Sequence, residues 1–277
     1  MGRIDEYQTV SSLDSDHRFL VFKDSAGTER IVSWANVKAD ALFPDATRWI
    51  QGILMTTWTT RASAADNQWR SVTWSPELGL FCAVANTGSG NRVMTSPDGI
   101  NWTTRASAAD NNWLSVTWSP ELGLFCAVAV TGAGNRVMTS PDGIVWTIRA
   151  SAADNGWLSV TWSPELSLFC AVANTGSGNR VMTSPDGITW TTRASAADNN
   201  WFSVTWSPEL GLFCAVAYSG SGNRVMTSPD GITWTLRTSA ADNEWRSVTW
   251  SPELGLFCAV AYTGTGNRVM TTEPCPA

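Results

Sequence analysis

The sequence lacks any long hydrophobic run and any basic character. No apolar stretch reaches the roughly 18 to 20 residues of a membrane-spanning helix. Residues 1–10 (MGRIDEYQTV) have neither the basic start nor the apolar core of a secretory signal. The formal net charge is −6, whereas proteins that bind phosphate backbones carry basic patches. We therefore expect no membrane insertion, no export signal and no nucleic-acid partner.

Residues that carry acid–base chemistry are also scarce. The single histidine, His17, and one of three tyrosines, Tyr7, precede the repetitive part of the chain. No spacing of Cys, His, Asp or Glu matches a metal site. Catalysis needs a distinct nucleophile, acid and orienting group, and the sequence singles out none. We predict a protein that is not an enzyme and that uses neither metal nor cofactor.

The six cysteines do not form a disulfide set. Five of them are one position copied five times: Cys82, Cys126, Cys170, Cys214 and Cys258. Such copies sit a whole unit apart, beyond the ~4.4 to 6.8 Å between Cα atoms that a disulfide needs. We interpret them as small apolar core residues and Cys275 as a lone thiol.

Repetition is what the sequence does contain. A 44-residue unit occurs five times, and the units that begin at Trp69 and Trp113 differ at only six positions. Each unit alternates short β-branched and aromatic runs with Pro- and Gly-rich turns, which indicates four strands. In the first unit these are Trp69–Trp74, Leu80–Ala85, Arg92–Thr95 and Ile100–Arg105. A unit of this length must stack on its neighbours to bury its apolar faces.

The ends of the array predict a ring. The last unit, from Trp245, stops before its fourth strand, while residues 58–61 (WTTR) match Trp102–Arg105. Pairing of these ends would remove the exposed sheet edges. The predicted fold is all-β: a five-bladed β-propeller of four-stranded blades, residues 53–277, closed by an amino-terminal strand. Three tryptophans per unit, Trp69, Trp74 and Trp102 in the first, are expected in its core.

Residues 1–52 share nothing with the repeat. HRFLVF and RIVSW indicate two short strands around a turn, and Trp34–Leu42 indicates a helix with Ser33 as its N-cap. We predict a small hairpin-plus-helix module that serves as a cap, an attachment piece or an oligomerisation piece.

The motif TSPDGINW (Thr95–Trp102) recurs as TSPDGIVW and twice as TSPDGITW. It resembles the Asp-box of sialidase-like BNR-repeat propellers in a form one residue shorter between Asp and Gly. The resemblance implies that the Asp accepts backbone N–H groups of a tight turn and that the Trp anchors the turn between blades. The matching residues are Asp98, Asp142, Asp186 and Asp230, with Trp102, Trp146, Trp190 and Trp234. Sialidase catalysis needs an asymmetric set of arginines, a Tyr–Glu pair and an acid, which these near-identical blades do not offer.

Differences between the copies gather in two loops that should share one face of the disc. These loops precede the first strand and join the second to the third. Their amides and hydroxyls, with occasional aromatics, suit sugars, although Asn also stabilises turns by itself. The candidate ligand-binding residues are Asn67, Asn86, Asn91, Asn111, Asn135, Asn155, Asn174, Asn179, Asn199, Tyr218, Asn223, Asn243, Tyr262 and Asn267.

A multivalent, lectin-like binding module is the leading functional hypothesis, because several weak sites on one rigid disc gain avidity. The segment containing SWANVKA resembles a short module at the start of many phage tail-fibre proteins. This implies a bacteriophage receptor-binding protein that contacts a cell-surface glycan or receptor. It further implies contacts with other tail proteins through residues 1–52, assembly as a homo-oligomer such as a trimer, and location in the virion tail after synthesis in the host cytoplasm. The alternatives are a structural protein-interaction disc and, less favoured, a degenerate glycosidase.

Overall fold

The computed structural model describes residues 7–13, 19–24, 29–33 and 58–274. Contacts divide the chain into two units, Met1–Thr60 and Arg61–Ala277. The elements in the described ranges are strands, and those ranges hold no helix long and apolar enough to cross a membrane.

The first unit contains one three-stranded antiparallel sheet. Its strands are β1 (Tyr7–Leu13), β2 (Phe19–Asp24) and β3 (Glu29–Ser33), in the order β1-β2-β3. The predicted hairpin corresponds to β2 and β3, which pair from Phe19 with Ser33 to Lys23 with Glu29. Strand β1 was not predicted. The helix predicted at 34–42 lies outside the described residues.

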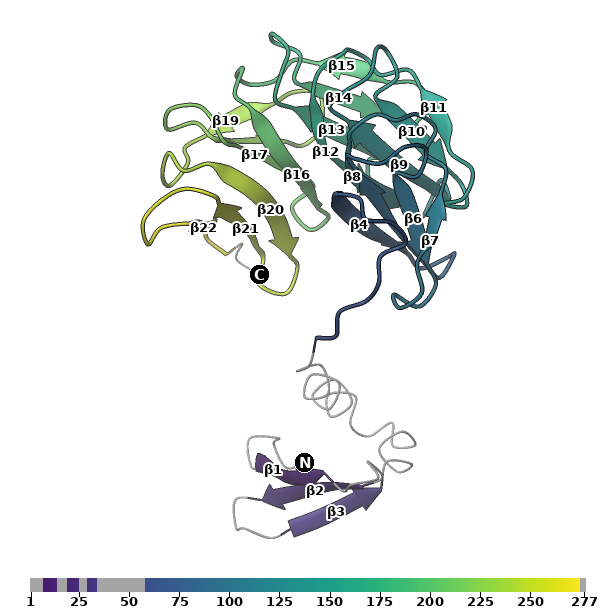
Figure 1. Cartoon of the computed structure of the whole chain (residues 1–277). Coiled ribbons are helices and arrows are strands. Elements are labelled where there is room, and N and C mark those ends of the chain that lie inside the picture. The colour runs from purple at the N-terminus through teal and green to yellow at the C-terminus, as the bar shows by residue number, and fades with distance from the viewer. Residues whose placement is uncertain (1–6, 14–18, 25–28, 34–57, 275–277) are drawn as a thin grey trace. The chain divides into compact units, whose positions relative to one another are not determined.

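The second unit consists of five antiparallel sheets, one per repeat, and confirms the predicted five blades. Successive blades lie side by side in chain order (Figure 1). Blade 1 contains β4 (Trp69–Ser75), β5 (Leu80–Ala85), β6 (Val93–Ser96) and β7 (Thr103–Arg105). Blade 2 contains β8 (Trp113–Ser119), β9 (Leu124–Ala129), β10 (Val137–Ser140) and β11 (Thr147–Arg149). Blade 3 contains β12 (Trp157–Ser163), β13 (Leu168–Ala173), β14 (Val181–Ser184) and β15 (Thr191–Arg193).

Blade 4 continues the pattern, and blade 5 is one strand shorter. Blade 4 contains β16 (Trp201–Ser207), β17 (Leu212–Ala217), β18 (Val225–Ser228) and β19 (Thr235–Arg237). Blade 5 contains β20 (Trp245–Ser251), β21 (Leu256–Ala261) and β22 (Val269–Thr271). In every complete blade the strands pair in sequence order, first to fourth.

Apolar side chains between neighbouring blades form the core. Between blades 1 and 2, Cys82, Val84 and Val93 contribute from blade 1. Blade 2 contributes a larger set: Trp113, Val116, Trp118, Phe125, Ala127, Ala129, Met138 and Trp146. The same positions recur between blades 2 and 3 and between blades 3 and 4. The repeat therefore encodes one junction, built from a narrow aliphatic face and a broad aromatic face.

Two polar contacts fix the register of each junction. The backbone N–H of Val116 donates to Ser71 Oγ of the preceding blade at 3.2 Å, and Trp118 Nε1 donates to Glu77 Oε2 at 2.6 Å. Equivalent bonds occur at the three following junctions. Because a buried indole N–H needs a partner, the Glu in the turn between the first two strands of one blade helps to fix the position of the next.

The predicted cysteine role is confirmed for the copied position. Cys82, Cys126, Cys170 and Cys214 are buried, Cys258 is partly buried, and all five are free thiols. Burial raises the pKa of the Cys214 thiol to about 12, so the thiol stays protonated and packs as a small apolar group. Cys275 lies outside the described residues.

The recurring SPDG turn is held by its aspartate, as the motif implied. Asp98 Oδ1 accepts the backbone N–H groups of Ile100 and Asn101, each at 2.8 Å. Gly99 adopts a positive φ of 69°, which favours glycine. These bonds keep residues 100 and 101 in the turn, so the fourth strand begins at Thr103 rather than at the predicted Ile100.

The predicted closing strand is not formed, which corrects this part of the fold prediction. Residues 58–61 adopt no strand, and within the described ranges blade 5 ends at β22. Elsewhere the fourth strand makes only three residue pairs and is attached by its own tight turn. At the closure that turn is absent, so three pairs would have to offset the entropy of joining distant parts of the chain.

Matched substitutions in two blades test the junction. Trp162 is 7% exposed and bonded to Glu121, whereas its counterpart Trp74 is 40% exposed because no blade precedes it. We expect Trp162→Ala to lower the free energy of unfolding by about 3 to 5 kcal/mol, the usual cost of truncating a buried Trp. Trp74→Ala should cost less than half as much. Urea unfolding followed by circular dichroism measures both, and equal losses would contradict the exposed first face.

The turn aspartates predict a loss of stability in acid. Partial burial raises the pKa of Asp186, but N–H groups of Thr189 and Ile188 outweigh it and hold the pKa below its ordinary value. A lowered folded-state pKa gives stability that is complete above about pH 4 and is lost as the pH falls through the folded value. We expect Tm to drop below pH 4 and the drop to shrink in Asp186→Asn. Asp66→Asn, outside this turn, is the control and should keep the full drop.

Candidate binding face

Two loops of each blade lie together, as the alternation of turns predicted. In blade 1 the backbone N–H of Gln68 donates to Thr87 Oγ1 at 2.8 Å, and the N–H of Asn86 donates to the Gln68 carbonyl at 3.1 Å. The other four blades repeat both bonds. These paired loops, residues 66–68 with 86–91 and their equivalents, are named the loop face.

Most of the predicted ligand-binding asparagines bond to one another within the loop face. Asn199 Nδ2 donates to the Asn223 carbonyl at 2.8 Å and to its side-chain Oδ1 at 3.1 Å. Asn199 is 7% exposed. A Cβ on Gly220 would lie 2.4 Å from Asn199 Nδ2, so the pair also requires a glycine beside it. The five pairs are Asn67 with Asn91, Asn111 with Asn135, Asn155 with Asn179, Asn199 with Asn223, and Asn243 with Asn267.

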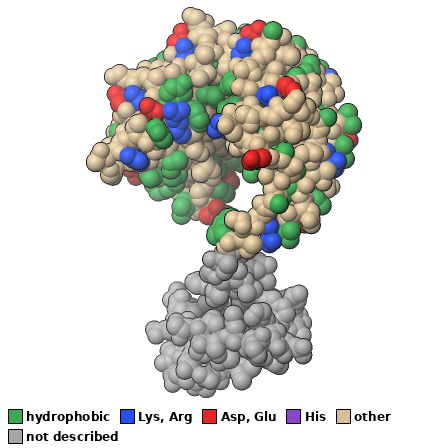
Figure 2. All heavy atoms as spheres, viewed as in Figure 1, with side chains coloured by type: hydrophobic (Ala, Val, Ile, Leu, Met, Phe, Trp, Pro, Cys, Tyr) green, Lys and Arg blue, Asp and Glu red, His purple; other side chains and the backbone are tan. Residues whose placement is uncertain are grey.

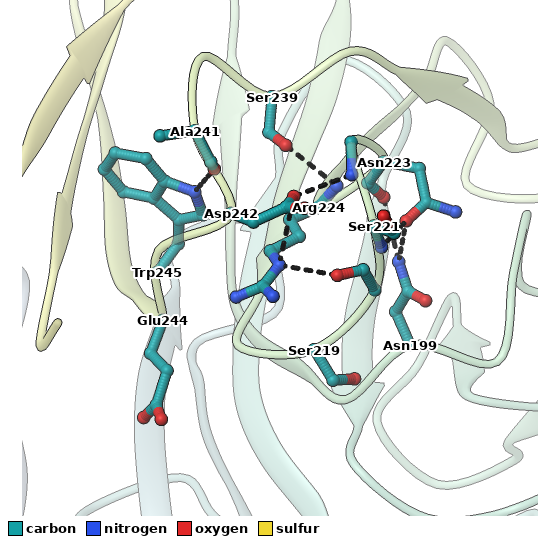
Figure 3. A network of polar contacts seen from close by, with 12 residues as sticks. Asn199, Ser219, Ser221, Asn223, Arg224, Ser239, Ala241, Asp242, Glu244 and Trp245 are labelled. Carbon is teal, nitrogen blue, oxygen red and sulfur yellow. Dashed lines mark hydrogen bonds and ion pairs between the residues drawn. The ribbon is translucent and has the colours of Figure 1, made fainter. Parts of the chain in front are cut away.

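An arginine and an aspartate clamp the loop faces of neighbouring blades together. Arg224 Nε lies 3.5 Å from Asp242 Oδ1 and donates to the Gly220 carbonyl at 2.9 Å. The same aspartate accepts the backbone N–H of Gly222 at 2.6 Å. Figure 3 shows this network with the Asn199–Asn223 pair beside it. Since these groups are already paired, the constant residues of the loop face hold the blades together and leave few free donors.

The remaining four candidates occupy a single repeat position. Asn86, Asn174, Tyr218 and Tyr262 correspond to one another, with Val130 in blade 2. On blades 3 to 5, Asn174 bonds to Tyr218, and Tyr218 and Tyr262 both contact Arg246. Asn174 Nδ2 donates to Tyr218 Oη at 3.1 Å, while Asn86, on blade 1, has a buried Oδ1 without a hydrogen-bond partner.

An arginine surrounded by aromatic rings lies on blades 4 and 5. The Arg246 guanidinium carbon is 4.3 Å from the ring centre of Tyr218, 4.8 Å from that of Phe202 and 5.8 Å from that of Tyr262. The Phe202 and Tyr218 rings meet edge to face with centres 6.0 Å apart. We name Phe202, Tyr218, Arg246 and Tyr262 the Arg246 cluster.

The Arg246 cluster is held from one side and open on the other. Glu244 pairs with Arg246, and both side chains are about one-third exposed. Tyr262 is 72% exposed. In Figure 3 the Glu244 carboxylate points away from the Arg224–Asp242 clamp, so the two acidic groups serve different arginines. The cluster therefore combines fixed charge, aromatic faces and solvent access.

Sequence reasoning missed two members of the Arg246 cluster and the acidic partner of its arginine. Phe202, Glu244 and Arg246 stand at positions that vary between repeats, yet the candidate list contained only amides and tyrosines. Arg70 is the blade 1 counterpart of Arg246, and it donates to Gln68 Oε1 at 3.1 Å instead of meeting aromatic rings. In blades 4 and 5 the positions that vary between repeats hold aromatic or charged residues. This pattern could have identified the cluster from the sequence.

Other chemistry is sparse in the described residues. They contain no group of three or more His, Cys, Asp or Glu that could hold a metal ion. Figure 2 shows basic and acidic side chains next to one another rather than in separate patches, in accord with the Arg–Asp pairs at each junction. The visible surface has no extended field of one sign that would attract a highly charged polymer.

Comparison with known proteins supports the fold and no more. No protein-family model matches the chain, and no curated protein matches it. Among solved structures, streptogramin B lyase aligns with a TM-score of 0.57 at 9% identity over 98% of this chain and 84% of its own. A GH74 enzyme from Niastella koreensis aligns with a TM-score of 0.57 at 14% identity over 69% of this chain, which spans 33% of that enzyme's length. Hydrazine synthase from Kuenenia stuttgartiensis aligns at 0.55, with 12% identity, over 75% and 58% of the two chains. The protein is thus similar to β-propellers.

Proposed function

We propose that this protein is a non-catalytic binding module that recognises a cell-surface glycan through the Arg246 cluster. The observation that carries the proposal is the convergence of Phe202, Tyr218 and Tyr262 on one arginine. The constant asparagines of the neighbouring loop face bond to one another instead. A sugar offers an apolar ring face and adjacent hydroxyl groups, and the cluster offers a counterpart to each.

The chemistry of the cluster supports a sugar over a purely apolar ligand. Aromatic rings present large rigid surfaces at low entropic cost. Arginine donates several hydrogen bonds in a fixed plane, and the pairing with Glu244 holds that plane in place. The carboxylate of Glu244 accepts hydroxyl protons beside the arginine. Tyr262, the most exposed member, is placed to lie against a ring.

The structure favours one principal site over five equal ones. The hypothesis of several weak sites on one disc relied on the repeated asparagines, and these bond to one another. Only blades 4 and 5 carry aromatic residues at the variable position that follows the second strand. Multivalency would then arise from several copies of the chain rather than from several blades.

The proposed biological setting is a phage tail fibre or receptor-binding protein. It rests on the resemblance of the segment containing SWANVKA to tail-fibre modules, a segment of which residues 34–42 lie outside the described residues. A propeller that carries a glycan site and a short attachment module suits that role. Contacts with other tail proteins and location in the virion belong to the same proposal.

A glycan-binding measurement tests the site. We expect the full chain to bind at least one glycan on a bacterial-surface glycan array, and Arg246→Ala and Tyr262→Ala to weaken binding about tenfold or more, or 1.4 kcal/mol. Arg70→Ala is the matched control, because it removes the same residue from blade 1 and should leave the affinity unchanged. Equal losses from Arg70→Ala and Arg246→Ala would overturn the location, and a chain that binds no glycan would favour the protein-interaction disc.

Substitution of the paired asparagines separates structure from binding. Asn199→Ala removes a buried amide that satisfies the Asn223 carbonyl, so we expect a loss of about 1 to 3 kcal/mol in unfolding free energy. The affinity of the folded variant for glycan should not change. Tyr262→Ala should show the reverse, with little change in Tm and reduced binding. A folded Asn199→Ala protein that no longer binds glycan would assign the asparagines to the site.

A further inference from the structure

Blade 5 has an unpaired edge where the other blades have a fourth strand. In blade 1 the third strand pairs with the fourth through Val93 with Arg105, Met94 with Thr104 and Thr95 with Thr103. In blade 5 the third strand, β22, has a neighbour on one side only among the described strands. Val269 is 60% exposed, whereas its counterpart Val93 pairs with the fourth strand and is fully buried against blade 2. An exposed apolar edge of this kind is a template for strand addition.

A cavity beside this edge marks where the missing tryptophan would lie. The cavity has a volume of about 520 Å³ and lies between blades 4 and 5, with Leu212, Thr227 and Phe257 in its wall. Their counterparts one blade earlier are Leu168, Thr183 and Phe213, and all three surround Gly231 of the blade 4 turn. Trp234, which donates to the Gly231 carbonyl, fills that place together with the turn. The core cluster between blades 4 and 5 contains no such tryptophan.

The chain holds one unused copy of the missing strand. Residues 58–61 read WTTR, as do Trp102–Arg105 of blade 1. Trp58 is 97% exposed, whereas its counterparts Trp146, Trp190 and Trp234 are each 8% exposed between blades. The molecule thus contains an exposed indole, and it contains a cavity at the place that blade 4 fills with a tryptophan and its turn.

The length of the linker to blade 1 limits what the chain's own copy can reach. Seven residues separate Arg61 from β4, and the same number joins Arg105 to β8 across two blades in contact. Closure within one chain therefore needs blades 1 and 5 to touch. Their facing sides are exposed instead, since Val72 is 60% and Val260 is 46% exposed, while Val116 and Val128 are 5% and 0% exposed. A second molecule can supply the strand without bending the four regular junctions.

We propose that blade 5 of one molecule is completed by residues 58–61 of a second copy. The donated strand pairs with β22 so that Thr60 lies opposite Met270, and Trp58 enters the cavity against Phe257. Arg61 Nε donates to Thr271 Oγ1, as Arg105 Nε donates to Thr95 Oγ1 at 2.9 Å in blade 1. Exchange of an identical element between molecules is a low-cost route to a dimer. This inference is independent of the proposed function.

Two variants, each with one introduced cysteine, test exchange between molecules directly. Thr60→Cys and Met270→Cys are prepared separately in a Cys275→Ser background and mixed, because opposed positions in a strand pair lie within disulfide distance. On oxidation we expect a disulfide-linked dimer in the mixture, identified by non-reducing electrophoresis and peptide mass spectrometry. Thr104→Cys replaces Thr60→Cys in the control, since Thr104 is already paired with Met94, and should give no cross-link.

The double variant distinguishes the two sources of the strand. Thr60→Cys combined with Met270→Cys should form dimers or larger cross-linked species. A disulfide within one chain would overturn the proposal and show closure by the chain's own strand. Absence of any disulfide between these positions would overturn strand completion altogether.

The wild-type protein provides an independent measurement. Sedimentation velocity should show a concentration-dependent dimer, and Trp58→Ala should raise its dissociation constant at least tenfold because the cavity loses its indole. Thr59→Ala, next to Trp58, is the control and should change it little. A dimer that is insensitive to Trp58→Ala would place the contact elsewhere, for example in residues 1–52, and a monomer at all concentrations would also overturn the proposal.

Discussion

The junction between neighbouring blades is the interaction on which the rest of the structure depends. A single blade exposes two apolar faces and is not stable by itself in water. Stacking buries an aromatic face against an aliphatic one, and each Trp removes ~150 to 250 Å² from water. The bonds from Val116 to Ser71 and from Trp118 to Glu77 then fix register. Since every internal junction has the same residues, the array is held by one interaction used four times.

Repetition of one junction also explains which positions of the repeat are constant and which vary. Positions that build the junction, the SPDG turn and the Arg–Asp clamp are nearly constant, because a change there would disturb the contact with a neighbouring blade. Variation occurs at positions outside these contacts, such as 202, 218, 246 and 262. The Arg246 cluster thus lies on a frame held by the constant contacts, and its arginine adds a contact between blades 4 and 5. Variable surface positions of this kind can be altered without refolding the blades.

The same logic accounts for the two ends of the array. An internal blade has a partner on each face, but within the described residues 58–274 blades 1 and 5 each contact one neighbouring blade. Capping repeats usually replace apolar residues with polar ones at such ends. Here Val72 and Val269 keep the apolar identity of the internal copies and are each 60% exposed. The first and last blades therefore each expose an apolar face that internal blades bury against a neighbour.

Much of the fold and less of the site could be read from the sequence. The alternation of short strands with Pro- and Gly-rich turns determined the all-β class, the five blades and the strand bounds of Leu80–Ala85, because these follow from local geometry. The copied cysteines could be placed in the core because identical positions on separate blades cannot meet. Identical sequence at 58–61 and 102–105 predicted closure, but only tertiary structure decides whether distant ends touch. The Arg246 cluster likewise joins side chains 16 to 60 residues apart, and the asparagines that seemed available to ligands bond to each other across 24 residues. The local pattern of strand and turn residues determines which strands form. Packing between blades determines which polar side chains are already bonded and which remain at the surface.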